Sequence, residues 1–522
     1  MELSKGRTTL AGVPEGLDAI VLGELAAGGD VMHIARDDAR LARLESDIAF
    51  FAPQIERLRF PAWECLPYDR VSPGRHVQAL RTASLARMSE PRAAETSGRI
   101  ILTTVSAVLQ RVVPRSFFAD ASFTVAPGRP FERQALFGYL EGNGFNRTGT
   151  VREPGEYAVR GGIIDLYAPD ATDPVRIDLF GEEIESIRRF DPGSQKTIGS
   201  GAAFTLRPVS EVLLNEAATT SFRTGYRALF GAAGAGDPIY EAISAGRAFA
   251  GMEHWLPLFH ESMETLFDHV SADQVTLDYQ IDEAVNARLD AIADYYLARL
   301  ELSGAEEGAA YRPLPPEQLF LDREAFEACL GPRRVAAFSP FPPADAQSNA
   351  VDIGGRPGIE FAAARTNPNL NLFDAVREAL VDLLAKGPRP VIAALSAGSR
   401  DRLAAVMAEH GIEETPTLDR WDQLVGVPES AVPLVVLDLE RGFQTRDFLI
   451  ITEQDVLGER LIRPPQRRRR TEDVLTELTS LEAGDLVVHV DHGVGRYEGL
   501  ETIDVGSAPH DCLRVIYDGN DR

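Results

Sequence analysis

Segments with strand character alternate with segments of helix character through the first hundred residues of the chain. The patterns predict helices near Gly16 to Ala27, from about Asp38 and from about Val77, and strands at 31–35, 56–60 and 99–104. A strand that returns parallel to its predecessor needs a long crossover, which a helix supplies. We therefore expect the N-terminal part to fold as an α/β domain with a parallel sheet.

A different pattern begins near Ala126 and interrupts this alternation. Residues 157–191 read as four short strands, separated by Gly161-Gly162, by the turn 169–174 and by Gly181-Glu182. Turns this short join antiparallel neighbours. The sequence therefore predicts an antiparallel sheet within an α+β insert, which also carries a helix near Phe131 to Glu141.

The rest of the chain divides by texture. A mixed region with a long amphipathic helix near Ile281 to Leu302 precedes a compact α/β unit, with helices near 374–386 and 400–409 and strands near 390–395 and 434–437. A linker, a short helix at 471–481 and three strands near 485–490, 495–502 and 512–517 follow.

Because 522 residues exceed what one hydrophobic core holds, we expect several domains. Their ranges are 1–125 and 211–350 for the two parts of one α/β domain, 126–210 for the insert, 351–460 for a small α/β domain, 461–480 for the basic linker and helix, and 481–522 for an incomplete β domain.

The charge balance is strongly acidic, with 53 Lys or Arg against 79 Asp or Glu and a net charge of -26. Such a chain repels phosphate backbones at long range, so non-specific nucleic-acid binding by the whole surface is not expected. The three cysteines, Cys65, Cys329 and Cys512, lack the spacing of disulfide frameworks or zinc sites. With no long apolar run, we expect a soluble, cytoplasmic protein without a membrane partner.

The segment LAGVPEGLDA, residues 10–19, lies where the first phosphate loop of a nucleotide-binding α/β domain would begin its helix. If Gly12 is the first glycine of that loop, Asp18 takes the lysine position and Ala19 the hydroxyl position. The chain has three lysines and none follows a glycine, so a standard phosphate loop is absent. Asp18 would repel phosphate, and the alternative is an ordinary loop before a helix.

Other chemical patterns are weak. His489, Asp491 and His492 could ligate a metal, but a strand that ends in a glycine turn accounts for them equally, and we predict no metal site. Glu182 and Glu183 could pair as acid and base, or flank a hairpin turn at the surface. The basic run Arg467, Arg468, Arg469 and Arg470 could contact a phosphate or an acidic surface, or be a flexible solvated linker. No catalytic residue is predicted.

The predicted strand within DPVRIDLF, residues 173–180, has an unusual outer face. Side chains alternate along a strand, so Val175, Ile177 and Leu179 form a core face while Arg176 and Phe180 lie on the other. Arg and aromatic residues are enriched at the centres of protein interfaces. The alternative is that the Phe180 ring packs beneath the insert's own helix and Arg176 lies at the rim of the core.

Several stretches together resemble the bacterial transcription-repair coupling factors. They are WECLPYDRVSPGRHVQALR (63–81), REPGEYAVRGGIIDLYAPD (152–170), RIDLFGEEIESIRRFDPGSQKT (176–197), DVLGERL (455–461) and VVHVDHGVGRYEGL (487–500). The resemblance covers essentially the whole chain in the order expected for the family. Its most specific part is HGVGRY, residues 492–497, which in that family and in CarD-like regulators opens the RNA-polymerase-interacting domain.

The resemblance implies a multidomain α/β fold. It consists of a vestigial UvrB-like parallel-sheet domain related to P-loop NTPases, an inserted α+β UvrA-binding domain, a second small α/β domain and an incomplete Tudor- or CarD-like β domain. In the family, helicase-like domains that use ATP and Mg follow; because they are missing here, we expect no cofactor and no enzyme activity in this chain. Since only three strands of the last barrel are present, we also expect the chain to be a fragment.

The resemblance also implies partners and contact residues. In the family, two arginines and a phenylalanine of the insert bind UvrA, and these correspond to Arg160, Arg176 and Phe180. Either of the last two is expected to be replaceable without unfolding the insert. The RNA polymerase β subunit is expected to meet the last strand, through either of its faces, with the contact residues Leu513, Arg514, Val515, Ile516 and Tyr517. Double-stranded DNA is a partner of the full-length family members, and we expect weak or no DNA binding by this chain, which we expect to be a monomer.

Three functions therefore compete. The first is a non-catalytic recruitment region for transcription-coupled repair, which binds UvrA and RNA polymerase. The second is a nucleotide-dependent excision-repair ATPase or helicase in its own right, which the missing Gly-Lys pair disfavours. The third is a DNA-binding module, which rests on Arg467 to Arg470 and opposes the net charge of -26.

Overall fold

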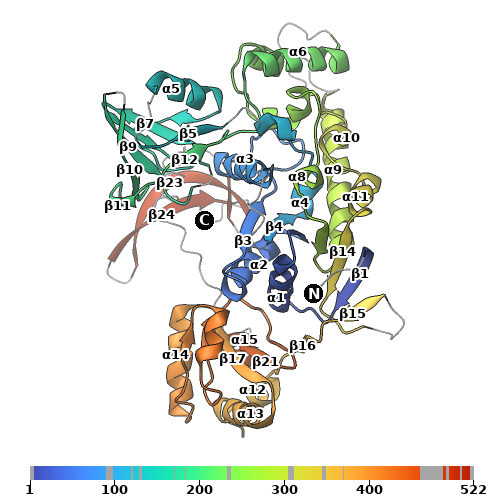
Figure 1. Ribbon diagram of the computed structural model, residues 1–522, viewed down its shortest axis with the longest axis vertical. Helices are drawn as coiled ribbons and strands as arrows, with labels where there is room; N and C mark the ends of the chain where they lie inside the picture. The colour runs from blue at the N-terminus through green and yellow to red at the C-terminus, as the bar shows by residue number, and fades with distance from the viewer. Residues whose placement is uncertain are drawn as a thin grey trace. The chain divides into compact units, whose positions relative to one another are not determined.

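The computed structural model describes most of the chain (Figure 1). The described residues are 5–89, 98–118, 122–127, 132–169, 171–181, 183–231, 237–303, 311–343, 349–367, 369–458, 486–489, 493–505 and 508–517. The chain forms two compact units, Met1–Glu459 and Arg460–Arg522. The basic run Arg467 to Arg470 and the predicted helix at 471–481 lie outside the described residues.

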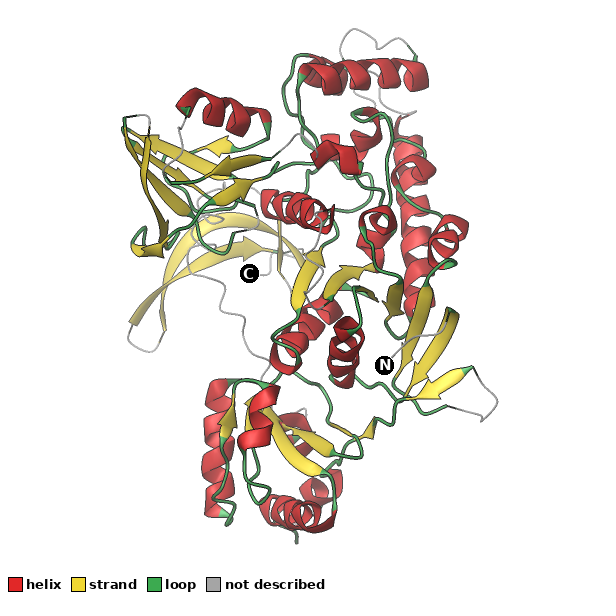
Figure 2. Ribbon diagram, in the orientation of Figure 1, coloured by secondary structure: helices red, strands yellow, loops and turns green. Residues whose placement is uncertain are grey.

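A seven-stranded, fully parallel sheet forms the centre of the first unit, as predicted (Figure 2). Its strand order is β15 (Ala350–Asp352), β1 (Gly6–Ala11), β14 (Arg334–Ser339), β13 (Gln274–Leu277), β2 (Val31–Ala35), β4 (Arg99–Thr104) and β3 (Glu56–Phe60). Segments on both sides of the insert therefore build one sheet. β15 extends this sheet two residues into the range predicted for the small α/β domain.

The sheet is buried on both faces, which explains why β2 reads as a continuous apolar run. Met32 and Ile34 point into one hydrophobic core, while Val31 and Ala35 point into the other. The surrounding helices are α1 (Leu17–Ala27), α2 (Asp38–Phe51), α3 (Arg75–Ser89), α4 (Val105–Val108) and α9 (Ile281–Ser303). Four of these helices were predicted, and α4 was not.

The mixed region after the insert is mainly helical. It contains α6 (Glu216–Phe230), α7 (Pro238–Ser244), the 3-10 helix η2 (Met252–Leu258), α8 (Leu266–His269), α10 (Pro316–Leu319) and α11 (Arg323–Leu330). Side chains from these elements, such as Phe222, Trp255 and Phe326, complete the core on one side of the large sheet. A further 3-10 turn, η1 (Arg115–Phe118), precedes the insert.

The insert has the predicted antiparallel meander at its centre. Its six-stranded sheet has the order β11 (Thr197–Ser200), β10 (Glu183–Phe190), β9 (Val175–Phe180), β8 (Ile163–Leu166), β7 (Glu156–Arg160) and β6 (Asn146–Arg147). The outer pair β6 and β7 is parallel. Helix α5 (Arg133–Gly142) packs on one face (Figure 2). The chain enters and leaves the insert through β5 (Phe123–Val125) and β12 (Phe204–Leu206), which pair antiparallel.

The small α/β domain has its own mixed sheet. The strand order is β16 (Arg356–Pro357), β20 (Phe443–Gln444), β21 (Phe448–Thr452), β17 (Arg389–Ala394), β19 (Leu434–Val436) and β18 (Thr417–Leu418). Its helices are α12 (Ala362–Thr366), α13 (Leu372–Lys386), α14 (Ala397–Glu409), η3 (Trp421–Gly426) and α15 (Glu453–Leu457). One face of this sheet joins the core that also contains α1 and α2, through Val435, Leu437 and Phe443.

The second unit contains the three predicted strands, which pair antiparallel. They are β22 (Leu486–His489), β23 (Gly493–Val505) and β24 (Ala508–Ile516). Gly495 is required by close packing, because a Cβ there would lie 2.4 Å from Val515 Cγ1. In neither unit does a described helix have the length and apolar character needed to cross a membrane.

Candidate functional site

The sheet of the insert has one closed face and one partly open face. Leu136 and Leu140 of α5 pack against Tyr157, Ile164 and other inward side chains of the meander, which closes the inner face. Part of the outer face is covered by a small cluster around the buried Phe190. The remainder, toward the turns that follow β7 and β9, is open to a partner.

The strand register defines which side chains share this outer face. Residues that pair directly across neighbouring strands point to the same side. One row contains Arg160, Ile163, Asp178 and Ser186, and the next contains Ala158, Asp165, Arg176 and Arg188. Phe180 lies two residues beyond Asp178 on β9, so it shares this side. All three residues expected to bind UvrA therefore lie on the same face.

Phe180 is the most exposed aromatic side chain on this face, at 78% of its full accessible area. It ends β9 immediately before Gly181, whose φ of 65° fits the tight turn into β10. The alternative in which the ring packs beneath α5 is wrong, because α5 lies on the opposite face. Aromatic side chains are enriched at protein interfaces.

Arg176 has an internal role that the sequence did not reveal. Its Nε and Nη2 donate to the two carboxylate oxygens of Asp165, at 2.6 and 2.9 Å, and its guanidinium lies 4.7 Å from the centre of the Phe190 ring. These hydrogen bonds raise the pKa of Arg176. Its side chain is 17% exposed and that of Asp165 is 2% exposed. We therefore expect Arg176→Ala to destabilise the insert, since Asp165 would lose its counter-ion in a buried site.

Arg160 is exposed, as Phe180 is, but it also forms hydrogen bonds within the insert, as Arg176 does. Its Nη2 donates to the carbonyl oxygen of Gly149 and, at 3.3 Å, to Thr150 Oγ1. These bonds orient the side chain along the edge of the open face without burying it. Arg160 therefore remains accessible to a partner.

A second ion pair on the open face was missed. Arg188 donates to both carboxylate oxygens of Asp178, at 2.8 and 2.7 Å, and Ser186 Oγ donates to the same carboxylate at 2.7 Å. The hydrogen bond from Arg188 is the main reason that the pKa of Asp178 lies below its usual value. The alternation within ESIRRF could have placed Arg188 opposite Arg176, but only with the strand register known.

The root of the insert is held to α3 by buried polar contacts. Arg81 donates to both carboxylate oxygens of Glu211, at 2.8 and 3.1 Å, with both side chains fully buried. Thr82 Oγ1 donates to the carbonyl oxygen of Pro208 at 2.7 Å, and Ser210 Oγ to Gln78 Oε1 at 2.8 Å. These contacts fix the chain that leaves the insert, so the open face is presented by an anchored domain.

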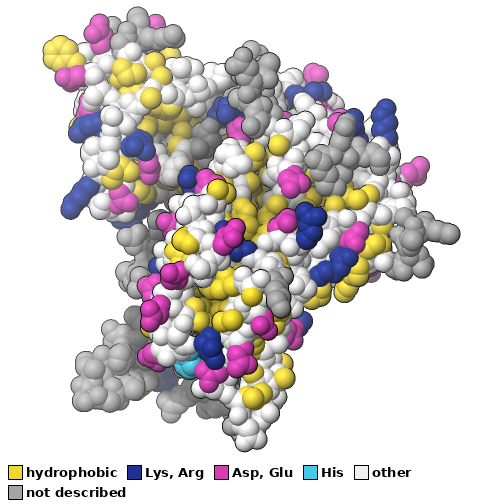
Figure 3. Space-filling model, turned by 60° about the horizontal axis from the view of Figure 1, so that its bottom comes forward, with side chains coloured by type: hydrophobic (Ala, Val, Ile, Leu, Met, Phe, Trp, Pro, Cys, Tyr) yellow, Lys and Arg dark blue, Asp and Glu magenta, His cyan; other side chains and the backbone are white. Residues whose placement is uncertain are grey.

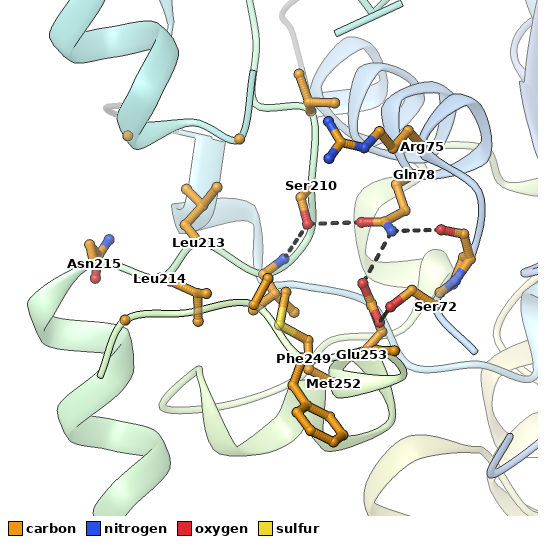
Figure 4. Close-up of a pocket in the computed structure, with 18 of the residues that line it drawn as sticks. Ser72, Arg75, Gln78, Ser210, Leu213, Leu214, Asn215, Phe249, Met252 and Glu253 are labelled. Atoms are coloured by element: carbon orange, nitrogen blue, oxygen red, sulfur yellow. Dashed lines mark hydrogen bonds between the residues drawn. The ribbon is translucent and has the colours of Figure 1, made fainter. Parts of the chain in front are cut away.

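A pocket of about 610 Å³ lies beside this root (Figure 4). Glu253 lies at its buried side, where it accepts hydrogen bonds from Ser72 Oγ at 2.6 Å and Gln78 Nε2 at 3.1 Å. Burial raises the pKa of this carboxyl. Apolar side chains, including Leu213, Leu214 and Met252, line other parts of the pocket. None of the predicted site residues lines it.

The loop predicted as a degenerate phosphate loop joins β1 to α1. Gly12 adopts a φ of 65°, Ala19 is fully buried, and Asp18 is buried at the start of α1. Asp18 forms an ion pair with Arg40 of α2. The Asp18 side chain therefore does not project into an open nucleotide site.

The predicted polymerase-contact residues lie on β24 and just after it. Arg514 Nε lies 3.1 Å from Glu498 Oε2, and Val515 and Tyr517 pack against Gly495. Ile516 pairs with Arg496, and Leu513 pairs with Leu500. Val515 and Tyr517 thus share one face of the strand, as alternation predicts.

The weaker predictions have mixed outcomes. His489 ends β22, while Asp491, His492 and Glu182 lie outside the described residues. Glu183 begins β10, is exposed and pairs with Phe180 in the strand register. Among the residues that the structure describes, no cluster of three or more His, Cys, Asp or Glu side chains is arranged to hold a metal ion.

Comparison with known proteins gives matches along most of the chain. Three family models match: the UvrB interaction domain at residues 123–211, the MFD D3 domain at 386–456 and the CarD-like/TRCF RID domain at 481–522. The transcription-repair-coupling factor of Escherichia coli K12 is 31% identical over 96% of this chain and 42% of its own length. The chain matches the N-terminal portion of a transcription-repair-coupling factor.

Other transcription-repair-coupling factors agree. Those of Rickettsia bellii and Myxococcus xanthus are 26% and 28% identical, each over 94% of this chain and 42% of their own length. The chain thus spans about two fifths of these curated relatives. The matched UvrB interaction domain begins three residues before the predicted insert and ends one residue after it, and it contains the whole open face with Phe180.

Proposed function

We propose that this chain is a non-catalytic recruitment region for transcription-coupled DNA repair. In this proposal the insert binds UvrA, the C-terminal β domain binds the β subunit of RNA polymerase, and the chain links the two. The matches to the UvrB interaction domain and the CarD-like/TRCF RID domain support these two partners. The region works as a monomer in the cytoplasm and needs no bound ATP or Mg.

The observation that carries the UvrA proposal is the exposure of Phe180. The insert uses its inner face for its own core and covers part of its outer face, but it leaves this ring uncovered beside Arg160 and the Asp178–Arg188 pair. Aromatic anchors surrounded by polar groups are the usual hot spots of protein interfaces. We assign Phe180 as the anchor, Arg160 as a direct contact, and Arg176 as a residue that supports the face from within.

The alternative function, an ATPase or helicase within this chain, has less support. The sequence lacks a lysine after any glycine, and the carboxylate of Asp18 lies at the position where a phosphate-binding cation is needed. DNA binding by the chain alone also has little support. On the face shown in Figure 3, the carboxylates of the described residues are interspersed with the Lys and Arg side chains.

The test of the UvrA proposal is calorimetric titration of the whole chain with UvrA. Phe180→Ala should weaken binding by about 2 kcal/mol or more, roughly a 30-fold loss of affinity, because a buried aromatic anchor is removed. Val425→Ala, which truncates a 92% exposed side chain of the small α/β domain, is the matched control and should bind normally. Equal affinity for UvrA in the two variants would remove the assignment.

The polymerase proposal has its own test. Ile516→Arg and Leu513→Arg place a charge on one face each of the last strand. In a protein whose C-terminal β domain is complete, the charge on the docked face should abolish binding to the polymerase β subunit, because it would be buried in the interface. Arg446→Ala is a suitable control, since this side chain is 95% exposed in the small α/β domain. Normal binding by both arginine variants would place the contact elsewhere.

A further inference from the structure

Four parallel strands of the large sheet end around one small cavity of about 110 Å³. Val13 and Glu15 follow β1, Arg36 follows β2, Asp278 and Tyr279 follow β13, and Pro340 follows β14. In open α/β sheets, ligands bind in the crevice outside the carboxyl ends of the strands. This cavity therefore occupies the position of a ligand site, yet charged side chains of the protein itself fill most of its surroundings.

The loop between β1 and α1 directs backbone donors toward this place. Both Gly12 and Gly16 have positive φ angles, 65° and 94°, which bend the chain into the N-terminus of α1. The N–H groups of Gly16 and Ala19 lie 3.0 and 2.8 Å from Asp18 Oδ1 and donate to it. Donors at a helix N-terminus are a general binding site for anions. Here they are occupied by a carboxylate of the helix itself.

A buried guanidinium completes the surroundings of this carboxylate. Arg40, only 1% exposed, forms an ion pair with Asp18 Oδ2, and its Nε lies 3.4 Å from Glu15 Oε1 and 3.8 Å from Asp278 Oδ1. Among the described residues, neither Nε nor Nη1 of Arg40 has a hydrogen-bond partner. A buried guanidinium needs a close anion to offset its loss of hydration. Asp18 supplies the closest one.

The remaining charged side chains form a ring of ion pairs around Asp18 and Arg40, in which carboxylates outnumber arginines. Arg36 donates to Glu15 Oε1 at 2.7 Å and to Asp278 Oδ2 at 3.2 Å. Arg43 lies 3.6 Å from Glu15 and 3.5 Å from Glu440 of the small α/β domain. Each carboxylate therefore has a cationic neighbour, and Arg43 connects the ring to the small α/β domain.

The loop is also covered from outside. The N–H of Gly355 donates to the carbonyl oxygen of Gly12 at 3.0 Å, and a Cβ at Gly355 would lie 2.5 Å from that oxygen. A Cβ at Gly16 would lie 2.7 Å from Cε1 of Phe443, on β20 of the small α/β domain. These contacts place residues of the small α/β domain against the loop and make the loop part of the interface between two domains.

We propose that the Asp18 carboxylate is a built-in anion that takes the place of a bound phosphate group. It accepts hydrogen bonds from the N–H groups of Gly16 and Ala19 and pairs with one nitrogen of the buried Arg40, and so holds the loop in the shape on which the small α/β domain packs. The site at the strand ends thus forms an ionic contact between the domain of the large parallel sheet and the small α/β domain. This inference is independent of the proposed partner binding, because it concerns neither the insert nor the C-terminal unit.

The experiment removes the built-in anion and supplies a free one. In the full chain, Asp18→Ala leaves Arg40 and the two N–H groups without their carboxylate, so the thermal midpoint should fall by about 5 °C in chloride buffer. Inorganic phosphate at about 50 mM, compared with chloride at equal ionic strength, should recover at least about half of that loss. The wild-type midpoint should move by less than about 2 °C, because its site is already filled.

Two further variants separate this proposal from general destabilisation. Phe190→Ala removes a fully buried ring of the insert and leaves the loop unchanged, so it should lose stability, and phosphate should give it no specific stabilisation. Asp18→Asn keeps the acceptor oxygen but loses the charge, so it should be less stable than wild type and unfold first at this contact between the two domains. Any variant that is unfolded in chloride is scored by the folded fraction that phosphate restores. Full stability of Asp18→Asn, or equal effects of phosphate on all proteins, would overturn the proposal.

Discussion

Guanidinium–carboxylate pairs occur in two regions of the molecule, one at the side of an open face and one in the interior. On the insert, Arg176 and Asp165 pair at the side of an open face, and the Phe180 ring at the end of the same strand as Arg176 stays exposed. At the β1–α1 loop, Arg40 and Asp18 pair inside the protein, and glycines, aliphatic groups and the Phe443 ring close over them. Guanidinium–carboxylate pairs therefore do not mark a binding site by themselves. The difference lies in whether the surrounding apolar groups are covered by the chain's own core.

One carboxyl near each region, Asp47 and Asp178, should respond to pH in opposite directions, and the larger effect is expected at Asp47. Asp47 of α2 is buried without a hydrogen-bond partner for either oxygen among the described residues. Burial raises its pKa to about 7, although Arg40 and Arg43 favour the charged form, while Glu15 and Asp438 disfavour it. A carboxyl with a raised pKa in the folded protein reduces stability as the pH rises from its unfolded value, near 3.8, toward about 7.

The first prediction follows from the direction of this pKa shift. Asp47→Asn imitates the protonated form, so it should increase the free energy of unfolding by about 4 kcal/mol near pH 8 and by less than about 2 kcal/mol near pH 5. Denaturant unfolding of both proteins at the two pH values measures this difference. On the open face, hydrogen bonding by Arg188 lowers the pKa of Asp178, so that pair should weaken as the pH falls. A pH-independent difference between Asp47→Asn and wild type would contradict the prediction.

The second prediction concerns the Arg176–Asp165 pair, which is more buried than Phe180 and less buried than the Arg40–Asp18 pair. Arg176→Ala should destabilise the insert by about 3 kcal/mol, because Asp165 is left as a buried and unpaired carboxylate. Replacing both residues, as Arg176→Ala with Asp165→Asn, should recover part of this loss. Hydrogen exchange of the insert strands, measured for the single and double variants, reports the local stability directly.

This prediction also corrects how a loss of UvrA binding is to be interpreted. If Arg176 contacts UvrA directly, the double variant should remain defective in binding although its insert is stable again. If Arg176 acts only through the fold, the double variant should bind with nearly normal affinity. A single variant with unchanged hydrogen exchange would show that the Asp165 pair contributes nothing to the insert.

Much of this architecture was predictable from local patterns. Period-two alternation placed Phe180 and Arg176 on one face, and the strand–helix alternation gave the parallel sheet. The missing parts depend on long-range geometry. The partner of Arg176 lies on a neighbouring strand, so it requires the β8–β9 register, and Arg40 reaches Asp18 only through the packing of α2 against α1. Strands such as β1, GRTTLA, and β13, QVTL, were missed because they are short and partly polar.

The last prediction concerns the smallest change in stability. Phe180→Ala should alter the free energy of unfolding by less than about 0.5 kcal/mol, because a ring that is 78% exposed loses little burial when it is truncated. Phe190→Ala, which removes a fully buried ring from the same face, should cost about 3 kcal/mol or more. Urea unfolding compares the two. If Phe180→Ala were as destabilising as Phe190→Ala, the ring would belong to the core, and the open face would be no more available to a partner than the closed loop.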